Sequence, residues 1–160
     1  MEENRKYLSR GLPLTAVLLF LYALLVSCSL PQIVVLEDPL SAAEHNDLGV
    51  AYENKGKFGL AEKEYRKAVK QKDDWATPYL NLGNLYYRQG NFEKAEHSLR
   101  KALAIDPSDP DILNNLAHIL FIQGRRMEAE RFIKQALAID PKPEYLDTLH
   151  QITGSGPSNN

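Results

Sequence analysis

The chain has 160 residues, with 19 Lys and Arg against 21 Asp and Glu, so its net charge at pH 7 is −2. This balance, with no basic stripe along the sequence, argues against nucleic-acid binding. The single cysteine cannot form an internal disulfide, so the composition fits a domain that needs none.

The first 27 residues are predicted to be a secretory signal peptide. Arg5, Lys6 and Arg10 form a basic region, and residues 12–26 are almost entirely apolar. A basic flank followed by an apolar segment is typical of such signals.

Leu25-Val26-Ser27-Cys28 closes this segment and resembles the lipobox of bacterial lipoproteins. The resemblance implies that the chain is cut before Cys28 and that this cysteine carries the lipid, such as palmitate. In that family an aspartate directly after the cysteine tends to hold the protein at the inner membrane, and Ser29 is not that signal. The resemblance therefore implies a lipid-anchored protein of the cell envelope and, if the cell is Gram-negative, a position at the outer membrane facing the periplasm.

The alternative is an uncleaved signal anchor in the inner membrane. Gly11–Leu30 is about 20 residues long, which is enough to cross a bilayer as a helix. Cys28 would then be an inert buried thiol. Both alternatives leave the rest of the chain on the far side of the membrane, because the positive flank stays in the cytoplasm.

Residues 28–41 are predicted to be the lipidated cysteine and a tether. At about 3.3 Å per residue, Ser29–Ser41 reaches at most ~40 Å from the membrane. Ile33–Leu36 is too apolar for a free linker, so it either packs on the domain that follows or contacts a lipid surface or a partner. Ser41 is suited to cap the first helix.

From residue 42 onward the chemistry repeats every 34 positions. Four sets of small or apolar residues have this spacing: Leu48, Leu82 and Leu116; Gly56, Gly90 and Gly124; Ala61, Ala95 and Ala129; Ala68, Ala102 and Ala136. A fixed period of this length predicts an all-α solenoid, in which each helix pair buries its apolar face against the next.

Residues 76–109 carry a characteristic set at fixed offsets: Tyr79, Leu82, Gly83, Tyr86, Ala95, Leu99 and Pro107. This set resembles the tetratricopeptide repeat, whose motif is W-x₂-L-G-x₂-Y, then A-x₃-F, then P. Residues 42–75 and 110–143 match in the same register. The resemblance implies three helix-turn-helix repeats, at 42–75, 76–109 and 110–143.

Six helices are predicted, near 42–55, 58–71, 76–89, 92–105, 110–123 and 126–139. Gly49, Gly83 and Ala117 are small because the two helices of a repeat must cross closely there. The glycines at 56, 90 and 124 are expected to be left-handed and to end the first helix of each pair.

Residues 144–152 are predicted to form a capping helix that covers the last repeat. Tyr145, Leu146, Leu149 and Ile152 lie at helical spacing and make one apolar stripe. Residues 153–160 are Thr, Gly, Ser, Pro and Asn and are expected to be disordered.

In tetratricopeptide proteins the first helix of each pair lines a concave face that holds extended peptides or helices. Carried onto this sequence, the resemblance implies a groove lined by Asn46, Asp47, Asn81, Asn84, Tyr87, Arg88, Asn114, Asn115, His118 and Phe121. Asn81 and Asn115 form a row with Asp47 at the repeat period. Because an amide both donates and accepts, such a row can pair with a peptide backbone. The alternative is that asparagine is simply common at this place in the family.

Tyr87, Phe121 and Ile122 are predicted to form a partly exposed patch, and exposed apolar patches usually mark contact sites. The alternative is that the capping helix covers Phe121 and Ile122.

Some family members grip the C-terminal carboxylate of heat-shock chaperones with cations on this face. Here those positions hold Asn46, Val50, Asp111 and Asn115, so no such clamp is expected.

Catalysis finds little support in the sequence. The four histidines show no H-E-x-x-H spacing, and no cysteine accompanies them. There is no G-x-S-x-G motif and no phosphate-binding glycine loop. No enzyme activity, metal, cofactor or small-molecule substrate is therefore expected.

The sequence thus predicts a membrane-anchored scaffold of the bacterial cell envelope that binds a protein or peptide. Two roles stay open. One is an assembly factor for a pilus or secretion system, resembling the pilotin lipoproteins. The other is an adaptor that recruits substrates to an envelope protease or a cell-wall hydrolase.

Overall fold

The computed structural model describes residues 14–15, 18–19, 22 and 38–154. The chain divides into two units, Met1–Glu37 and Asp38–Asn160, and the fold below is that of the second. The lipobox with Cys28, the Ile33–Leu36 segment and residues 155–160 lie outside the described residues. Within the part of the chain that the structure describes, no helix combines the length and the apolar character that crossing a membrane requires.

Residues 38–154 are all helical apart from short connections, which confirms the all-α prediction. The helices follow one another in the order α2 (Ala42–Asn54), α3 (Phe58–Gln71), α4 (Ala76–Arg88), α5 (Phe92–Ile105), α6 (Pro110–Ile122), α7 (Arg126–Ile139) and α8 (Pro143–Thr153). The bounds of the first six of these helices, α2 to α7, differ by at most one residue from the predicted ranges. Thr153, expected in the disordered tail, is instead the last residue of α8.

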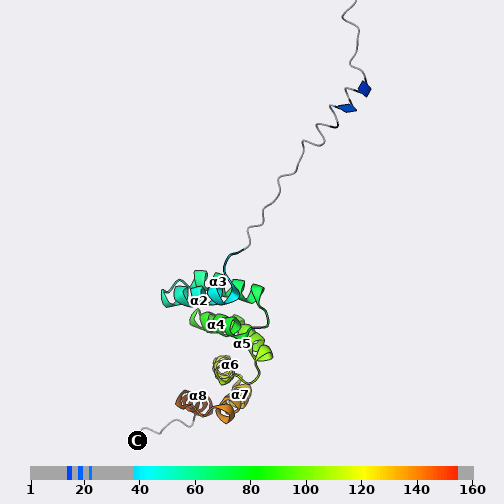
Figure 1. Cartoon of the computed structure of the whole chain (residues 1–160). Coiled ribbons are helices and arrows are strands. Elements are labelled where there is room, and N and C mark those ends of the chain that lie inside the picture. Colours follow the sequence, from blue (N-terminus) through cyan, green and yellow to red (C-terminus); the bar gives the residue numbers. More distant parts are fainter. Residues whose placement is uncertain (1–13, 16–17, 20–21, 23–37, 155–160) are drawn as a thin grey trace, which may run out of the picture. The chain divides into compact units, whose positions relative to one another are not determined.

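The helices pack as three pairs, α2 with α3, α4 with α5 and α6 with α7, and each pair stacks on the next (Figure 1). The crossing of each pair is close. A Cβ added at Gly83 would lie 2.6 Å from Leu99 Cγ, and one at Gly49 would lie 2.5 Å from the Tyr65 ring. The small residues at these positions are therefore required by packing, as the sequence predicts.

The turns inside the pairs depend on glycine. Gly56, Gly90 and Gly124 have φ of 69°, 73° and 79°, a conformation that other residues rarely adopt. Asp106 and Asp140 cap the second helices of the last two pairs, and the prolines that follow cannot continue them. The left-handed glycines inside the pairs and the prolines after the second helices thus both agree with the sequence prediction.

Helix α8 packs on α6 and α7 and ends the stack (Figure 1). Tyr145 and Ile152 are buried, and the Tyr145 hydroxyl donates to the Asp111 carboxylate. The predicted apolar stripe is wrong in one member, because Leu146 is 42% exposed whereas Thr148 is buried. Thr148 can be buried because its hydroxyl donates to the Glu144 carbonyl 3.1 Å away.

The start of the domain is tied to its first repeat. Ser41 caps α2 in a capping box with Glu44, as expected. Asp38 pairs with Lys67 of α3 at 2.8 Å, and its carboxylate lies 3.2 Å from Nε2 of the buried His45. The other ring nitrogen of His45 lies 2.7 Å from Glu64. Asp38 therefore ties the start of the domain to both helices of the first pair.

The close crossing leads to a prediction about stability. We expect Gly83→Ala to lower the free energy of unfolding by about 1–3 kcal/mol, because the new methyl group must displace Leu99. The matched control is Gly59→Ala on α3, where an added Cβ meets no atom within 4 Å. That change should be neutral or stabilising by up to about 1 kcal/mol. Urea unfolding of both variants checks this, and equal effects would show that the crossing does not require glycine.

Candidate functional site

The first helices of the second and third pairs bring most of the predicted groove residues to one pocket. The pocket has a volume of about 380 Å³ and is lined by Asn84, Tyr87, Arg88, Leu99, Asn114, Asn115, His118 and Ile119. Six of these eight residues were predicted from the sequence. A volume of this size accommodates one or two side chains of a ligand.

The asparagines of this face pair with one another between consecutive repeats. Asn81 Nδ2 donates to Asn46 Oδ1 at 2.8 Å, and Asn115 Nδ2 donates to Asn84 Oδ1 at 2.9 Å. These bonds join α2 to α4 and α4 to α6. The amide row is therefore partly used to hold neighbouring repeats together.

Unused hydrogen-bonding capacity remains in the amide row. An asparagine offers two donors and an acceptor oxygen with two lone pairs, so each pair leaves groups over. Asn114 Nδ2 donates to Asn115 Oδ1 at 3.2 Å, whereas the buried Asn114 Oδ1 has no partner among the described residues. Buried acceptors are rarely left unpaired in native proteins.

Tyr87 and His118 form the aromatic side of the pocket. His118 Nε2 lies 3.1 Å from the Tyr87 hydroxyl oxygen, and the two rings meet edge to face at 5.2 Å. Burial lowers the pKa of His118 below its usual value, so the imidazole is neutral at pH 7. Tyr87 remains 40% exposed, as the sequence predicts for a contact residue.

Arg88 is already neutralised by its surroundings. Its Nη1 lies 2.8 Å from Glu53 Oε1, and its guanidinium stacks over the Phe58 ring at 4.9 Å. The other oxygen of Glu53 accepts from the Tyr65 hydroxyl at 2.8 Å. Burial and this carboxylate raise the pKa of Tyr65, which therefore stays protonated and donates. Arg88 thus belongs to a network between the first two repeats.

The other four predicted groove residues, Asn46, Asp47, Asn81 and Phe121, and their neighbour Ile122 lie apart from the pocket. Asn46 is only 6% exposed. It therefore serves mainly to accept the hydrogen bond from Asn81 and has little surface for a ligand to contact. Asp47 is exposed on α2, and Phe121 is half-buried against the core. The alternative that the capping helix covers both Phe121 and Ile122 does not hold for Ile122, which is exposed.

Two pocket residues were not predicted. Leu99 and Ile119 belong to the core and form the apolar floor of the pocket. Leu99 was assigned to packing by its place in the repeat motif. Its second role depends on the neighbouring α6, which the motif of a single repeat does not describe.

Metal binding has no support in the described part of the chain, where no three His, Cys, Asp or Glu side chains gather as a metal site would require. The absence of an enzyme activity or a cofactor stays a prediction.

Three comparisons bear on this arrangement. Two family profiles, both described as tetratricopeptide repeat, match residues 39–108 and 86–152. No curated protein matches the sequence.

Similar folds occur among solved structures. The first TPR of Spaghetti (RPAP3) bound to the HSP90 peptide SRMEEVD has a TM-score of 0.70 and 22% identity, covering 74% of this chain and 94% of that chain. The second TPR domain of human RPAP3, in complex with the HSP70 peptide SGPTIEEVD, has a TM-score of 0.67 and 20% identity, covering 70% and 94%. The Arabidopsis OM64 TPR domain has a TM-score of 0.68 and 20% identity, covering 72% and 96%.

At these identities the likeness concerns the fold. The two profiles, however, run through all three helix pairs and through most of α8. Residues 39–152 of this chain are therefore a domain of tetratricopeptide repeats.

Proposed function

We propose that this chain is a membrane-anchored interaction module that binds a peptide or helix of another protein in the pocket between α4 and α6. The observation that carries the proposal is the unused hydrogen-bonding capacity beside an exposed aromatic ring. Asn114 Oδ1 lacks a partner among the described residues, and the partly exposed Tyr87 lines the same pocket. A peptide N–H that enters the pocket would pair with this oxygen after a rotation of the Asn114 side chain.

Two similarly folded domains support peptide binding as the activity, since each was solved with a peptide. Those two peptides end in acidic residues, EEVD. Here the one cation of the pocket, Arg88, is already paired with Glu53, and no other charged side chain lines the pocket. The ligand of this pocket is therefore a neutral or polar segment with an apolar side chain, and no carboxylate clamp is proposed.

The location that we propose rests on the N-terminal sequence. Cys28 in its lipobox context would carry a lipid and hold the repeats at the outer membrane, facing the periplasm. The tether of residues 28–41 would keep the start of the repeat domain within ~40 Å of the bilayer. The alternative is an uncleaved helix in the inner membrane, in which Cys28 would carry no lipid and remain an inert thiol.

Within the envelope, the role that we propose is that of an assembly factor for a pilus or secretion system, similar to the pilotins. A small lipid-anchored domain with one peptide pocket suits the delivery of a single subunit to the membrane. The alternative is an adaptor for an envelope protease or cell-wall hydrolase. Deletion of the gene distinguishes the two roles. Loss of an assembly factor should abolish pili or secretion, whereas loss of the adaptor should alter the cell wall.

The pocket is tested by Tyr87→Ala combined with Asn115→Ala, in crosslinked pull-downs from intact membranes. We expect capture of the partner to fall by about tenfold, because two central contact side chains are removed. The removed Asn115–Asn84 bond should cost about 1 kcal/mol of stability, so circular dichroism must show that the variant remains folded. Met127→Ala is the control, since this apolar side chain is 88% exposed outside the pocket. Unchanged capture by the double variant would contradict the proposal.

The anchor is tested by Cys28→Ala in cells supplied with a clickable palmitate analogue. The wild-type protein should take up the label and run as the cut form, whereas Cys28→Ala should lose the label and accumulate as precursor. Ser29→Ala, one residue further on, should behave as wild type. A wild-type protein without label, whose size does not change on substitution, would instead indicate the uncleaved helix.

A further inference from the structure

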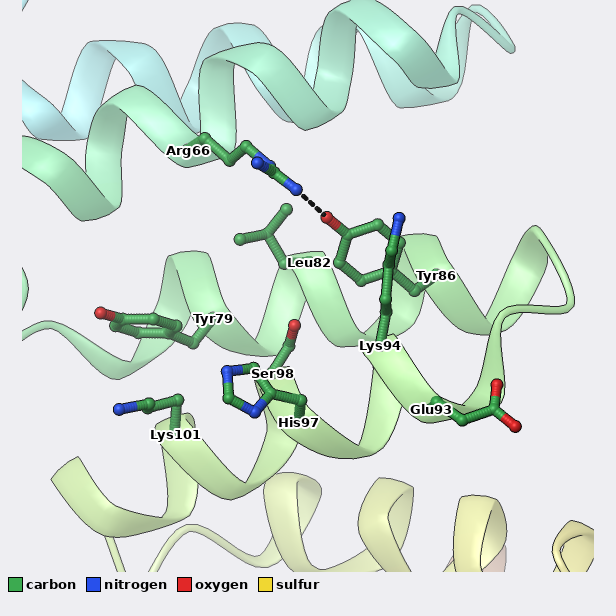
Figure 2. A pocket seen from close by; sticks show the side chains of 9 residues that line it. All are labelled: Arg66, Tyr79, Leu82, Tyr86, Glu93, Lys94, His97, Ser98 and Lys101. Atoms are coloured by element: carbon green, nitrogen blue, oxygen red, sulfur yellow. Dashed lines mark hydrogen bonds between the residues drawn. The ribbon is translucent and has the colours of Figure 1, made fainter.

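A second pocket lies between α3, α4 and α5, and the peptide groove does not use it (Figure 2). Its volume is about 400 Å³. One wall is a row on α4 at helical spacing, formed by Tyr79, Leu82 and Tyr86. The facing wall is a row on α5, formed by Lys94, His97 and Lys101. Apolar and aromatic groups therefore face a cationic edge.

The second repeat has a small residue at one position of this pocket. Ser98 is buried and lines the pocket, and the position 34 residues later holds Phe132, which is also buried. The position 34 residues earlier holds Glu64, which contacts His45. The third repeat also has a pocket, of about 480 Å³, between α5, α6 and α7, but its lining is apolar apart from Gln135 and contains no lysine.

The cations of the α5 row are free to bind a ligand. Lys94 and Lys101 form no ion pair within residues 38–154, although Lys94 Nζ lies 5.4 Å from the centre of the Tyr86 ring. Arg66, by contrast, is paired with Glu62 at 2.9 Å and donates to the Tyr86 hydroxyl at 3.0 Å (Figure 2). Glu93 is the only carboxylate of the lining, and it lies at the opposite end of the pocket from Lys101 (Figure 2). The lining thus has an excess of positive charge.

Packing does not require these cations. The positions equivalent to Lys94 hold Leu60 and Glu128 in the other repeats. Lys101 corresponds to Lys67, which is paired with Asp38, and to Gln135. Lysine at both of these positions therefore occurs only in the second repeat.

We propose that this pocket binds an acidic peptide segment of a partner protein, with an apolar side chain between Tyr79, Leu82 and Tyr86 and carboxylates on Lys94 and Lys101. The two lysines are seven residues apart on α5, a distance of about 10 Å along the helix. An extended chain covers this distance in about three residues. The ligand pattern is thus two acidic residues three positions apart with apolar residues between them.

The apolar wall argues against a compact anion. A single phosphate is held by polar donors alone, so it would leave Tyr79, Leu82 and Tyr86 without a partner. The pocket lies on the face formed with α3, away from Asn115 and His118, so it could be occupied together with the groove.

The test uses the full chain in a neutral detergent and the fluorescein-labelled peptide Gly-Glu-Leu-Phe-Glu-Gly as the probe. Fluorescence polarisation compares it with the same peptide carrying Gln in place of both Glu. We expect the acidic peptide to bind about tenfold more tightly than the Gln peptide, and this difference should shrink at about 0.5 M salt. Equal affinity for the two peptides, or no binding of either, would overturn the proposal.

Two variants locate the site. Ser98→Phe fills the pocket with the residue that the third repeat already carries, and Ser98→Ala is its control, which leaves the space open. Lys94→Glu with Lys101→Glu reverses the charge, and Lys63→Glu with Lys70→Glu makes the same change at exposed positions of α3 outside the pocket.

We expect Ser98→Phe and the Lys94/Lys101 variant each to weaken binding of the acidic peptide by at least about tenfold. Both controls should stay within about twofold of wild type. The charge variant keeps the test decisive if Ser98→Phe does not fold, which circular dichroism would reveal. Binding that survives the charge reversal, or that is lost equally in the Lys63/Lys70 control, would overturn the proposal.

Discussion

The two helices of a repeat cross where the first helix carries glycine or alanine, and the rest of the domain depends on this contact. Gly83 faces Leu99 and Gly49 faces Tyr65 at distances that leave no room for a methyl group. The crossing brings the alanines at 61, 95 and 102 into the core with no exposed surface. It also fixes which side of each first helix is left to face a neighbouring repeat or a ligand.

Directional polar bonds then set how one repeat sits on the next. On the groove side these are the asparagine pairs and the Arg88–Glu53 contact. On the other side, the Tyr86 hydroxyl donates to Glu62 at 2.8 Å. An exposed ion pair contributes only about 0–1 kcal/mol, so burial of apolar surface holds the repeats together, and the polar bonds determine their register. Asn115 both donates to Asn84 and lines the first pocket, so a substitution there would change ligand binding and stability together.

The repeat period made the helices, the left-handed glycines and the close crossings predictable, because each of these recurs at a fixed offset in the sequence. The amide pairs were not predictable in this way. Asn81 bonds to a residue 35 positions earlier and Asn115 to one 31 positions earlier, since the bonds join non-equivalent positions of neighbouring helices. The two carboxylates around His45 likewise come from the tether and from α3, and only the tertiary fold brings them together.

The second pocket was missed for a related reason. A search for a basic stripe along the sequence does not find Lys94 and Lys101, because only two lysines are involved. Their importance depends on the α4 side chains that face them across the pocket. Residues that packing requires recur in every repeat, so the positions where the second repeat departs from the others carry the information about ligands. Ser98 is such a departure, and so is Tyr87, which corresponds to Glu53 and Phe121.

Both pockets draw on α4, with Tyr87 on one side and Tyr86 on the other. Because α4 is held against α5 at Gly83 and has a repeat on each side, a shift of this helix would alter both pockets at once. The two sides of α4 thus allow one small domain to present two different surfaces: an amide-lined pocket suited to a neutral segment and a cationic pocket suited to an acidic one.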